Sequence, residues 1–286
     1  MVNEEYNNMV YFSNLLPERC PKTFKGLKDI LTRYGVEIGL IEGTKDIWCR
    51  DYMPVQITGT RFSLFRYEPD YLLDNDEHKA TITDNSIASR YIGTSYLHDC
   101  RHIKLDGGNV VPGFDKAIMT SKVFEENPQY DPLELLEQLT RTFGTDIVIL
   151  PWNTNEIYGH ADGIVRFIDD HTVLMTNYAQ YDPAMAARFR RILKANFKNV
   201  HELSFRASKP NKYSWAYINW LQTDKVLVLP KFGIPEDQEA YEQISKLMPQ
   251  YKGCIEMVDT TDLIRYEGGL NCASWTFFDT PNFDLP

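Results

Sequence analysis

A short polar loop near the middle of the chain places an imidazole between two carboxylates. The segment NTNEIYGHADG contains Glu156, His160 and Asp162, and its glycines at 159 and 163 give the backbone freedom to aim these side chains. An imidazole beside a carboxylate can donate and accept protons near neutral pH, so we interpret His160 as a general acid or base. A His-x-Asp pair can also ligate a metal. No further His or Cys lies at zinc-ligand spacing, however, and we predict no metal.

A cysteine near the C-terminal end has surroundings that could make it reactive. Cys272 ends the segment YEGGLNC, in which Gly268 and Gly269 form a turn, and it leads into the apolar stretch ASWTFF. An unpaired cysteine is usually a small buried hydrophobe, which is how we interpret the other four. A thiol becomes a nucleophile when a cation or base stabilises its thiolate. Cys272 is therefore the candidate nucleophile, if the fold brings it to His160.

Two further polar segments lie in the first half of the chain. DIWCRD, at 46–51, contains Trp48 and Asp51, and DGGN begins at Asp106 and ends at Asn109. All four polar segments interrupt apolar patterns typical of strands and follow the same kind of predicted strand. We therefore expect their side chains to form one site.

The order of predicted elements explains how such distant loops could meet. A hairpin, a helix and a strand recur in that order, starting near 109, 163 and 215, a period of about fifty residues. Asp131-Pro132 and Asp182-Pro183 mark the starts of two of the helices. An earlier unit has a hairpin at 52–67, a weaker helix at 82–92 and a strand at 102–105.

A fifth unit can be assembled only from the two ends of the chain. Strands at 273–278 and 9–13 would pair, followed by a helix at 22–34 and a strand at 36–42. The fold class is then α/β, with five ββαβ units around a pseudo-fivefold axis and a ring closed by the termini, which leaves no exposed sheet edge. The loops after each third strand would converge on the axis. An ordinary doubly wound sheet is the alternative.

Composition limits the class of partner. The formal net charge of −10 argues against nucleic acid, whose phosphates are held by clustered Lys and Arg, and it suits a small cationic substrate. Five cysteines without a CxxC pair indicate neither a disulfide framework nor a zinc finger. The chain has no signal-like N-terminus and no run of membrane-spanning length, so we expect a cytoplasmic protein with no membrane partner. A homodimer is left open.

These motifs resemble the agmatine deiminase and bacterial-type peptidylarginine deiminase family of the pentein, or guanidine-modifying, superfamily. The resemblance runs through most of the chain. It rests on DIWCRDYMPV, LDGGNVV, the E-x-x-x-H-x-D spacing, SWAYINW followed by VLVLPKFG, and EGGLNC. It implies a single pentein catalytic domain over residues 1–286, folded as a five-bladed α/β propeller.

The resemblance also implies an activity. The expected reaction is the cysteine-dependent hydrolysis of a guanidino group to a ureido group and ammonia, on agmatine, a related guanidino compound or peptidylarginine, with no cofactor. Cys272 would be the nucleophile and His160 the general acid and base. Asp51 and Asp162 would hold the guanidinium nitrogens, and Glu156 would sit beside His160.

The remaining residues that the resemblance assigns are expected to bind substrate. Trp48 would form a wall of the pocket, and Gly269 would lie beside the nucleophile. Asp106, Gly107 and Asn109 belong to a motif that usually begins with Glu. The chain also departs from the family where Asn271 replaces a common histidine before the nucleophile, and where Met53 replaces a common glycine.

Three other functions fit some of these features. An amidinotransferase would use the same site but pass the amidino group to an amine. A non-catalytic pentein binding protein would have no reason to gather Cys, His and several acids at the axis. A papain-like amidase would ordinarily have its Cys before its His, and an acidic pocket would serve no purpose in it.

Overall fold

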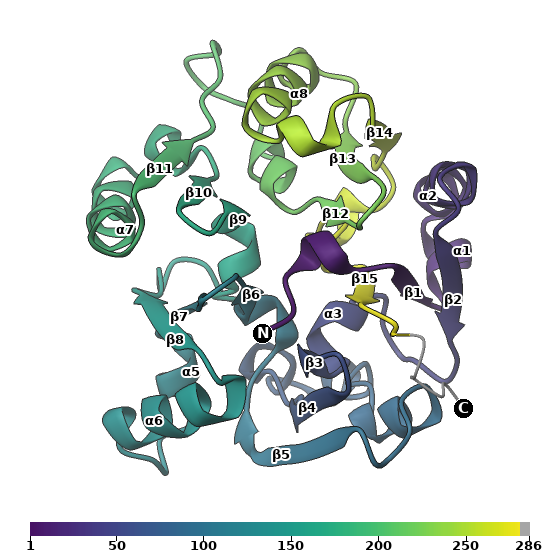
Figure 1. The fold of residues 1–286 in the computed structure, drawn as a ribbon, viewed down its shortest axis with the longest axis vertical. Helices are drawn as coiled ribbons and strands as arrows, with labels where there is room; N and C mark the ends of the chain where they lie inside the picture. Colours follow the sequence, from purple (N-terminus) through teal and green to yellow (C-terminus); the bar gives the residue numbers. More distant parts are fainter. Residues whose placement is uncertain (281–286) are drawn as a thin grey trace.

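A computed structural model of the protein describes residues 1–280, and these residues form five three-stranded sheets. The sheets are β15 (Ser274–Phe277), β1 (Met9–Ser13) and β2 (Glu37–Ile41); β3 (Val55–Thr58), β4 (Arg61–Arg66) and β5 (Leu97–Lys104); β6 (Val111–Pro112), β7 (Lys116–Thr120) and β8 (Asp146–Leu150); β9 (Val165–Asp169), β10 (Thr172–Met175) and β11 (Asn199–Glu202); and β12 (Leu221–Gln222), β13 (Leu227–Lys231) and β14 (Ile255–Asp259). The sheets lie around the middle of the molecule (Figure 1).

Every sheet repeats one pairing scheme. The middle strand pairs antiparallel with one neighbour and parallel with the other, as β7 does with β6 and β8. The parallel partner always follows the middle strand along the chain. A parallel pair needs a crossover connection. Four sheets use a long helix for it, and these helices lie on the outside (Figure 1). They are α2 (Pro21–Arg33), α6 (Pro132–Phe143), α7 (Pro183–Asn196) and α8 (Glu236–Leu247).

The predicted helix starts are confirmed. The Asp131 carboxylate accepts hydrogen bonds from the first-turn N–H groups of Leu133 and Glu134, and the Asp182 carboxylate caps α7 at Met185 in the same way. A proline occupies the first helical position in both helices, where its missing N–H costs nothing.

The connection between β4 and β5 differs from the prediction. The weak helix expected at 82–92 is a 3-10 helix, η3 (Asn85–Arg90), preceded by η2 (Asp70–Leu72) and α4 (Asp76–Lys79). The following strand begins at Leu97 rather than at 102. Its first half is mostly exposed, and Cys100 is the buried position there, so no apolar alternation indicates a strand.

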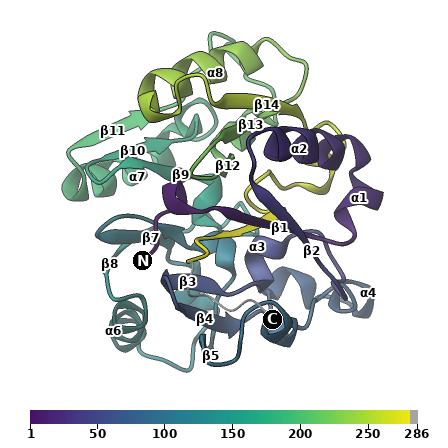
Figure 2. The same ribbon diagram turned by 45° about the vertical axis from the view of Figure 1, so that its right-hand side comes forward.

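The ends of the chain share one sheet, as predicted. β1 pairs antiparallel with β15, with Met9 opposite Phe277, and parallel with β2. Figure 2 shows β1 beside β15. The apolar cluster around these strands contains Val10 and Leu27 together with Val228 and Val258, so it also joins the first sheet to the last.

The polar segments follow β2, β5, β8 and β14, as expected. Three of them contain a short helix, namely α3 (Cys49–Tyr52), η4 (Gly107–Asn109) and η5 (Ala161–Gly163). The fourth follows the short helix η9 (Ile264–Tyr266) and leads through turns to Cys272. Within residues 1–280, every helix is too short or too polar to cross a membrane.

Candidate active site

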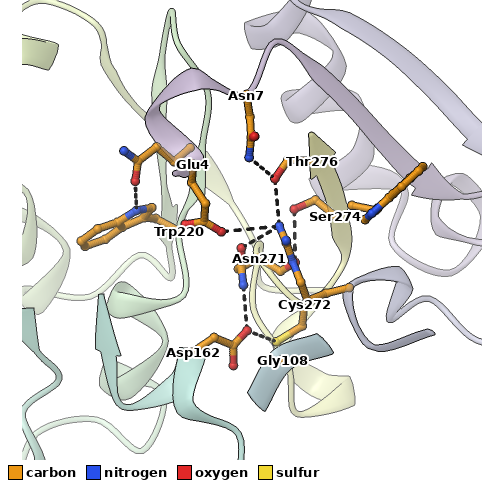
Figure 3. Close-up of polar contacts among 12 residues, drawn as sticks. Glu4, Asn7, Gly108, Asp162, Trp220, Asn271, Cys272, Ser274 and Thr276 are labelled. Atoms are coloured by element: carbon orange, nitrogen blue, oxygen red, sulfur yellow. Dashed lines mark hydrogen bonds and ion pairs between the residues drawn. The ribbon is translucent and has the colours of Figure 1, made fainter. Parts of the chain in front are cut away.

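The sulfur of Cys272 contacts the loop that carries His160. It lies 3.6 Å from Asp162 Oδ2 and 3.3 Å from Asn219 Oδ1, and the residue is only 9% exposed. The N–H of Cys272 donates to the same Asn219 oxygen at 3.2 Å. Figure 3 shows Cys272 and Asn271 both reaching Asp162. The thiol is thus held by two oxygen acceptors in a buried position.

The imidazole of His160 is held between two carboxylates from other sheets. Its Nδ1 lies 3.7 Å from Asp51 Oδ1, and its Nε2 lies 3.2 Å from Asp106 Oδ2. Asp106 also accepts a hydrogen bond from the hydroxyl of Tyr71 at 3.2 Å. The structure therefore brings together residues from all four polar segments.

A glycine allows these groups to come so close. The N–H of Gly108 donates to Asp51 Oδ1 at 2.9 Å. A Cβ at position 108 would lie 2.6 Å from that oxygen and 2.6 Å from His160 Nδ1, which is closer than real side chains approach. A Cβ at the predicted Gly107 would likewise lie 2.0 Å from the backbone oxygen of Arg50. Both glycines let η4 pack against α3, and the sequence analysis overlooked Gly108.

Two predicted residues bond to backbone near the site. Asn109 Oδ1 accepts the N–H of Thr120 in β7 at 2.8 Å, so its side chain fixes η4 to that strand. The carboxylate of Glu156 accepts the N–H groups of Tyr158 and Gly159 at 2.8 and 2.7 Å. Glu156 therefore shapes the backbone that leads to His160, and the oxygens at the imidazole belong to Asp51 and Asp106.

The glycine pair before Cys272 lies against two larger side chains. Gly268 packs directly on the ring of Trp48, and Gly269 packs on the side chain of Asn219. A Cβ at either position would overlap these groups. Trp48 and Gly269 are thus part of the same loop cluster as Cys272.

Comparison with known proteins identifies the family. A sequence profile of the Porphyromonas-type peptidyl-arginine deiminases matches residues 20–277. The chain belongs to this family. Members are deiminases, which are hydrolases of guanidino carbon–nitrogen bonds, and the resemblance noted in the sequence is confirmed. No curated protein matches the sequence.

Solved structures with the same fold include other deiminases. The agmatine deiminase of C. jejuni is 18% identical, with a TM-score of 0.74 over 98% of this chain and 96% of that one. The agmatine deiminase of Enterococcus faecalis is 16% identical, with a TM-score of 0.71 over 96% and 94%. DDAH from Pseudomonas aeruginosa is 14% identical, with a TM-score of 0.58 over 95% and 100%. The likeness shows that the family member has their α/β fold.

Burial and charge set the protonation of this deiminase's central groups. Burial alone would lower the pKa of His160, but Asp51, Asp106 and Asp162 outweigh it and raise that pKa to about 10. Burial, followed by the charges of Asp162 and Asp51, raises the pKa of the Cys272 thiol well above its usual range. Burial also raises the pKa of Asp51. These shifts favour an imidazolium at His160 and a neutral thiol at Cys272.

A second polar cluster lies next to Cys272 and Asp162 in this family member. Asn271 donates to Asp162 Oδ2 at 2.8 Å and accepts from the guanidinium of Arg50 at 3.0 Å. Arg50 also donates to Thr276 Oγ1 at 3.0 Å and lies 3.8 Å from Glu4, which forms an ion pair with the buried Arg166. The backbone N–H of Arg50 donates to the Cys272 carbonyl at 3.1 Å.

The sequence analysis did not include these supporting residues in the site. Asn219 lies in SWAYINW, a motif quoted only for its resemblance, and Asn271 was noted only as a departure. Tyr71 comes from a stretch with no periodic pattern. Within residues 1–280, no group of three or more His, Cys, Asp or Glu is arranged to hold a metal ion.

Proposed function

We propose that the protein hydrolyses a guanidino group to a ureido group and ammonia, with Cys272 as the nucleophile. One observation carries the proposal: the Cys272 sulfur lies 3.6 Å from Asp162, on the loop whose His160 is held by Asp51 and Asp106. A thiol, an imidazole and several acids are the groups that this reaction needs. Membership of the deiminase family supports the same assignment.

The carboxylates would receive the guanidinium. Asp51, Asp106 and Asp162 are buried, and His160 is the cation among them. Such a cluster favours a cationic ligand, because opposed carboxylates hold a planar guanidinium through charge-assisted hydrogen bonds. We assign Asp51 and Asp162 to the guanidinium nitrogens and Asp106 to His160. The face of Trp48 suits a delocalised planar cation.

The reaction then has two halves. The bound cation lowers the pKa of Cys272, the thiol releases its proton to solvent water, and the sulfur of the resulting thiolate adds to the guanidinium carbon. His160 gives a proton to the departing nitrogen, so that ammonia leaves and a thiouronium intermediate remains. His160, now neutral, takes a proton from water. The resulting hydroxide attacks the same carbon, the carbon–sulfur bond breaks, and the ureido product leaves.

The substrate is a guanidino compound, and we propose agmatine or another simple guanidino amine before peptidylarginine or arginine. Solved agmatine deiminases share the fold, and one was solved with its substrate bound. Arg50 and Arg166 are occupied by Glu4 behind the site, so neither is available to an α-carboxylate. A panel of guanidino compounds assayed for ureido product tests this order.

We also propose that the five sheets close into one propeller that forms a single domain over residues 1–286. The pairing of β1 with β15 supports closure, although residues 281–286 lie outside the described part. A cytoplasmic location and a homodimer stay predictions.

Product analysis tests the reaction directly. Purified protein incubated with agmatine should yield ammonia and a ureido compound in equal amounts. A new guanidino compound in the presence of an added amine would instead indicate an amidinotransferase. Ureido product from pure Cys272→Ala protein would exclude the covalent mechanism.

A further inference from the structure

Glu267 has an unusual backbone conformation close to the nucleophile. It follows η9, five positions before Cys272, with φ of 66° and ψ of 28°. It is the one non-glycine residue with a positive φ among residues 1–280. Side chains other than Gly, Asn and Asp rarely adopt this left-handed conformation, and such outliers cluster at functional sites. The side chain of Glu267 is also exposed, so a ligand can reach it.

The carboxylate of Glu267 is fixed at the edge of the site by one hydrogen bond. The hydroxyl of Tyr158 donates to Glu267 Oε2 at 2.9 Å and so links the Cys272 loop to the His160 loop. The ring of Tyr158 lies 6.3 Å from that of His160 and 5.0 Å from that of Tyr71, between ring centres. Tyr158 thus contacts Glu267 through its hydroxyl and lies beside the imidazole of His160 through its ring.

The protonation of Tyr158 agrees with this position. Burial first, and then the hydrogen bond and charge of Glu267, raise the pKa of the phenol well above its usual range. A thiolate at Cys272 would raise this pKa as well, so the phenol lies within electrostatic range of the sulfur. Tyr158 therefore stays the donor of this hydrogen bond, and Glu267 accepts it with further lone pairs to spare.

The pocket wall leads to the same carboxylate. Trp48 packs directly on Gly268, the residue after Glu267. A substrate whose guanidinium lay among the buried carboxylates and whose chain ran along Trp48 would therefore lie next to Gly268, one residue from Glu267.

We infer that Glu267 determines specificity by binding a positively charged group at the end of the substrate remote from the guanidinium. This inference rests on the proposed function. A carboxylate there attracts an ammonium and repels a carboxylate. The favoured substrate class is therefore a guanidinoalkylamine, and a guanidino acid of the same length is disfavoured.

Arg265 provides a matched control two positions away. It is exposed like Glu267, but it lines a separate hollow with Tyr213 and Phe232, and none of the proposed catalytic residues lines that hollow. If charge on this loop had only a general effect on substrate preference, a variant of either residue would change that preference. If Glu267 binds the substrate directly, only a Glu267 variant would change it.

The test compares agmatine with butylguanidine, which has the same chain length and no distal charge. The ratio of their kcat/KM values should fall about fivefold in Glu267→Gln, the size expected for a partly exposed ion pair. Glutamine can still accept the Tyr158 hydrogen bond, so the substitution removes mainly the charge. Arg265→Gln should leave the ratio unchanged, and Glu267→Lys should shift preference toward 4-guanidinobutanoate.

Two results separate failure of this inference from failure of the proposed function. An unchanged ratio in Glu267→Gln would overturn the role of Glu267 while leaving deimination intact. This includes the case in which kcat/KM falls equally for both compounds. If wild-type protein turned over no guanidino compound, the proposed function would fail instead. Calorimetric affinities of both compounds for Cys272→Ala protein, with and without Glu267→Gln, give the same ratio without turnover.

Discussion

Two buried charge clusters lie on either side of Asn271, and they are built in opposite ways. In front, the carboxylates of Asp51, Asp106 and Asp162 surround the single cation His160. Behind, two guanidinium groups share the carboxylate of Glu4 and make further hydrogen bonds to neutral oxygens. In the front cluster acidic side chains outnumber the one cation, whereas in the rear cluster two guanidinium groups outnumber the one carboxylate and complete their hydrogen bonds with neutral oxygens. We interpret the front as prepared for a cation and the rear as a support.

The comparison predicts that front residues set activity and rear residues set stability. Cys272→Ala should have the largest effect, a loss of at least about 10³-fold in kcat, because the covalent route disappears. His160→Ala should have a similar effect, because the leaving nitrogen loses its proton donor. Steady-state assays of ureido product measure both variants. Thermal unfolding within a few degrees of wild type would show that the fold is intact, and unfolded variants would leave the comparison without support.

Asp51→Asn should have the next largest effect on activity. It keeps the size of the side chain and removes a carboxyl group that would bind the guanidinium as a carboxylate, so kcat/KM should fall by an amount equivalent to roughly 2–5 kcal/mol. The loss should appear mainly in kcat if Asp51 positions the guanidinium for attack. Equal activity in wild type and variant would remove Asp51 from the site.

Glu4→Gln tests the rear cluster. It leaves the buried guanidinium of Arg166 and the half-buried one of Arg50 without a carboxylate. Breaking a buried ion pair such as that of Arg166 costs about 3 kcal/mol or more of unfolding free energy. Urea denaturation measures the loss. The activity of the molecules that stay folded should change far less than in Asp51→Asn. A Glu4→Gln protein with normal stability and low kcat would reverse the assignment of the two clusters.

The smallest expected effect is a shift in pH dependence. Because burial and two carboxylates raise the pKa of Cys272, its alkylation by iodoacetamide should be slow at neutral pH and increase with pH as the thiolate forms. A bound guanidinium should move the midpoint to lower pH. Cys272→Ala protein corrects for the other thiols, of which Cys254 is partly exposed. If the alkylation rate measured without a guanidino ligand had its midpoint at low pH, the description of the front cluster would be contradicted.

Much of the fold and the centre of the site could be predicted because the repeat constrains both. The capped helices at Asp131 and Asp182 and the strands around them recur in order, and each polar segment follows a third strand. From this recurring order alone, Cys272, His160 and Asp51 could be predicted to lie near one another. The irregular connection at 85–90 was mistaken for a helix because a short 3-10 turn has a similar composition.

The partner of each polar side chain could not be predicted in the same way. Glu156 and Asn109 are types that bind ligands, but both satisfy backbone N–H groups beside them. Asn219 and Tyr158 support the site through contacts between segments far apart in the sequence. Such choices depend on how closely two loops approach, and the periodicity of strands and helices carries no information on that distance.

The sheet shared by the two ends of the chain has a consequence for biosynthesis. Cys272 directly precedes β15, and that strand pairs with β1, which the ribosome makes much earlier. β1 therefore finds this partner only after the chain has emerged as far as Phe277. A polypeptide that stops before β15 lacks this pairing, so we expect the proposed catalytic centre to assemble only after β15 has been translated.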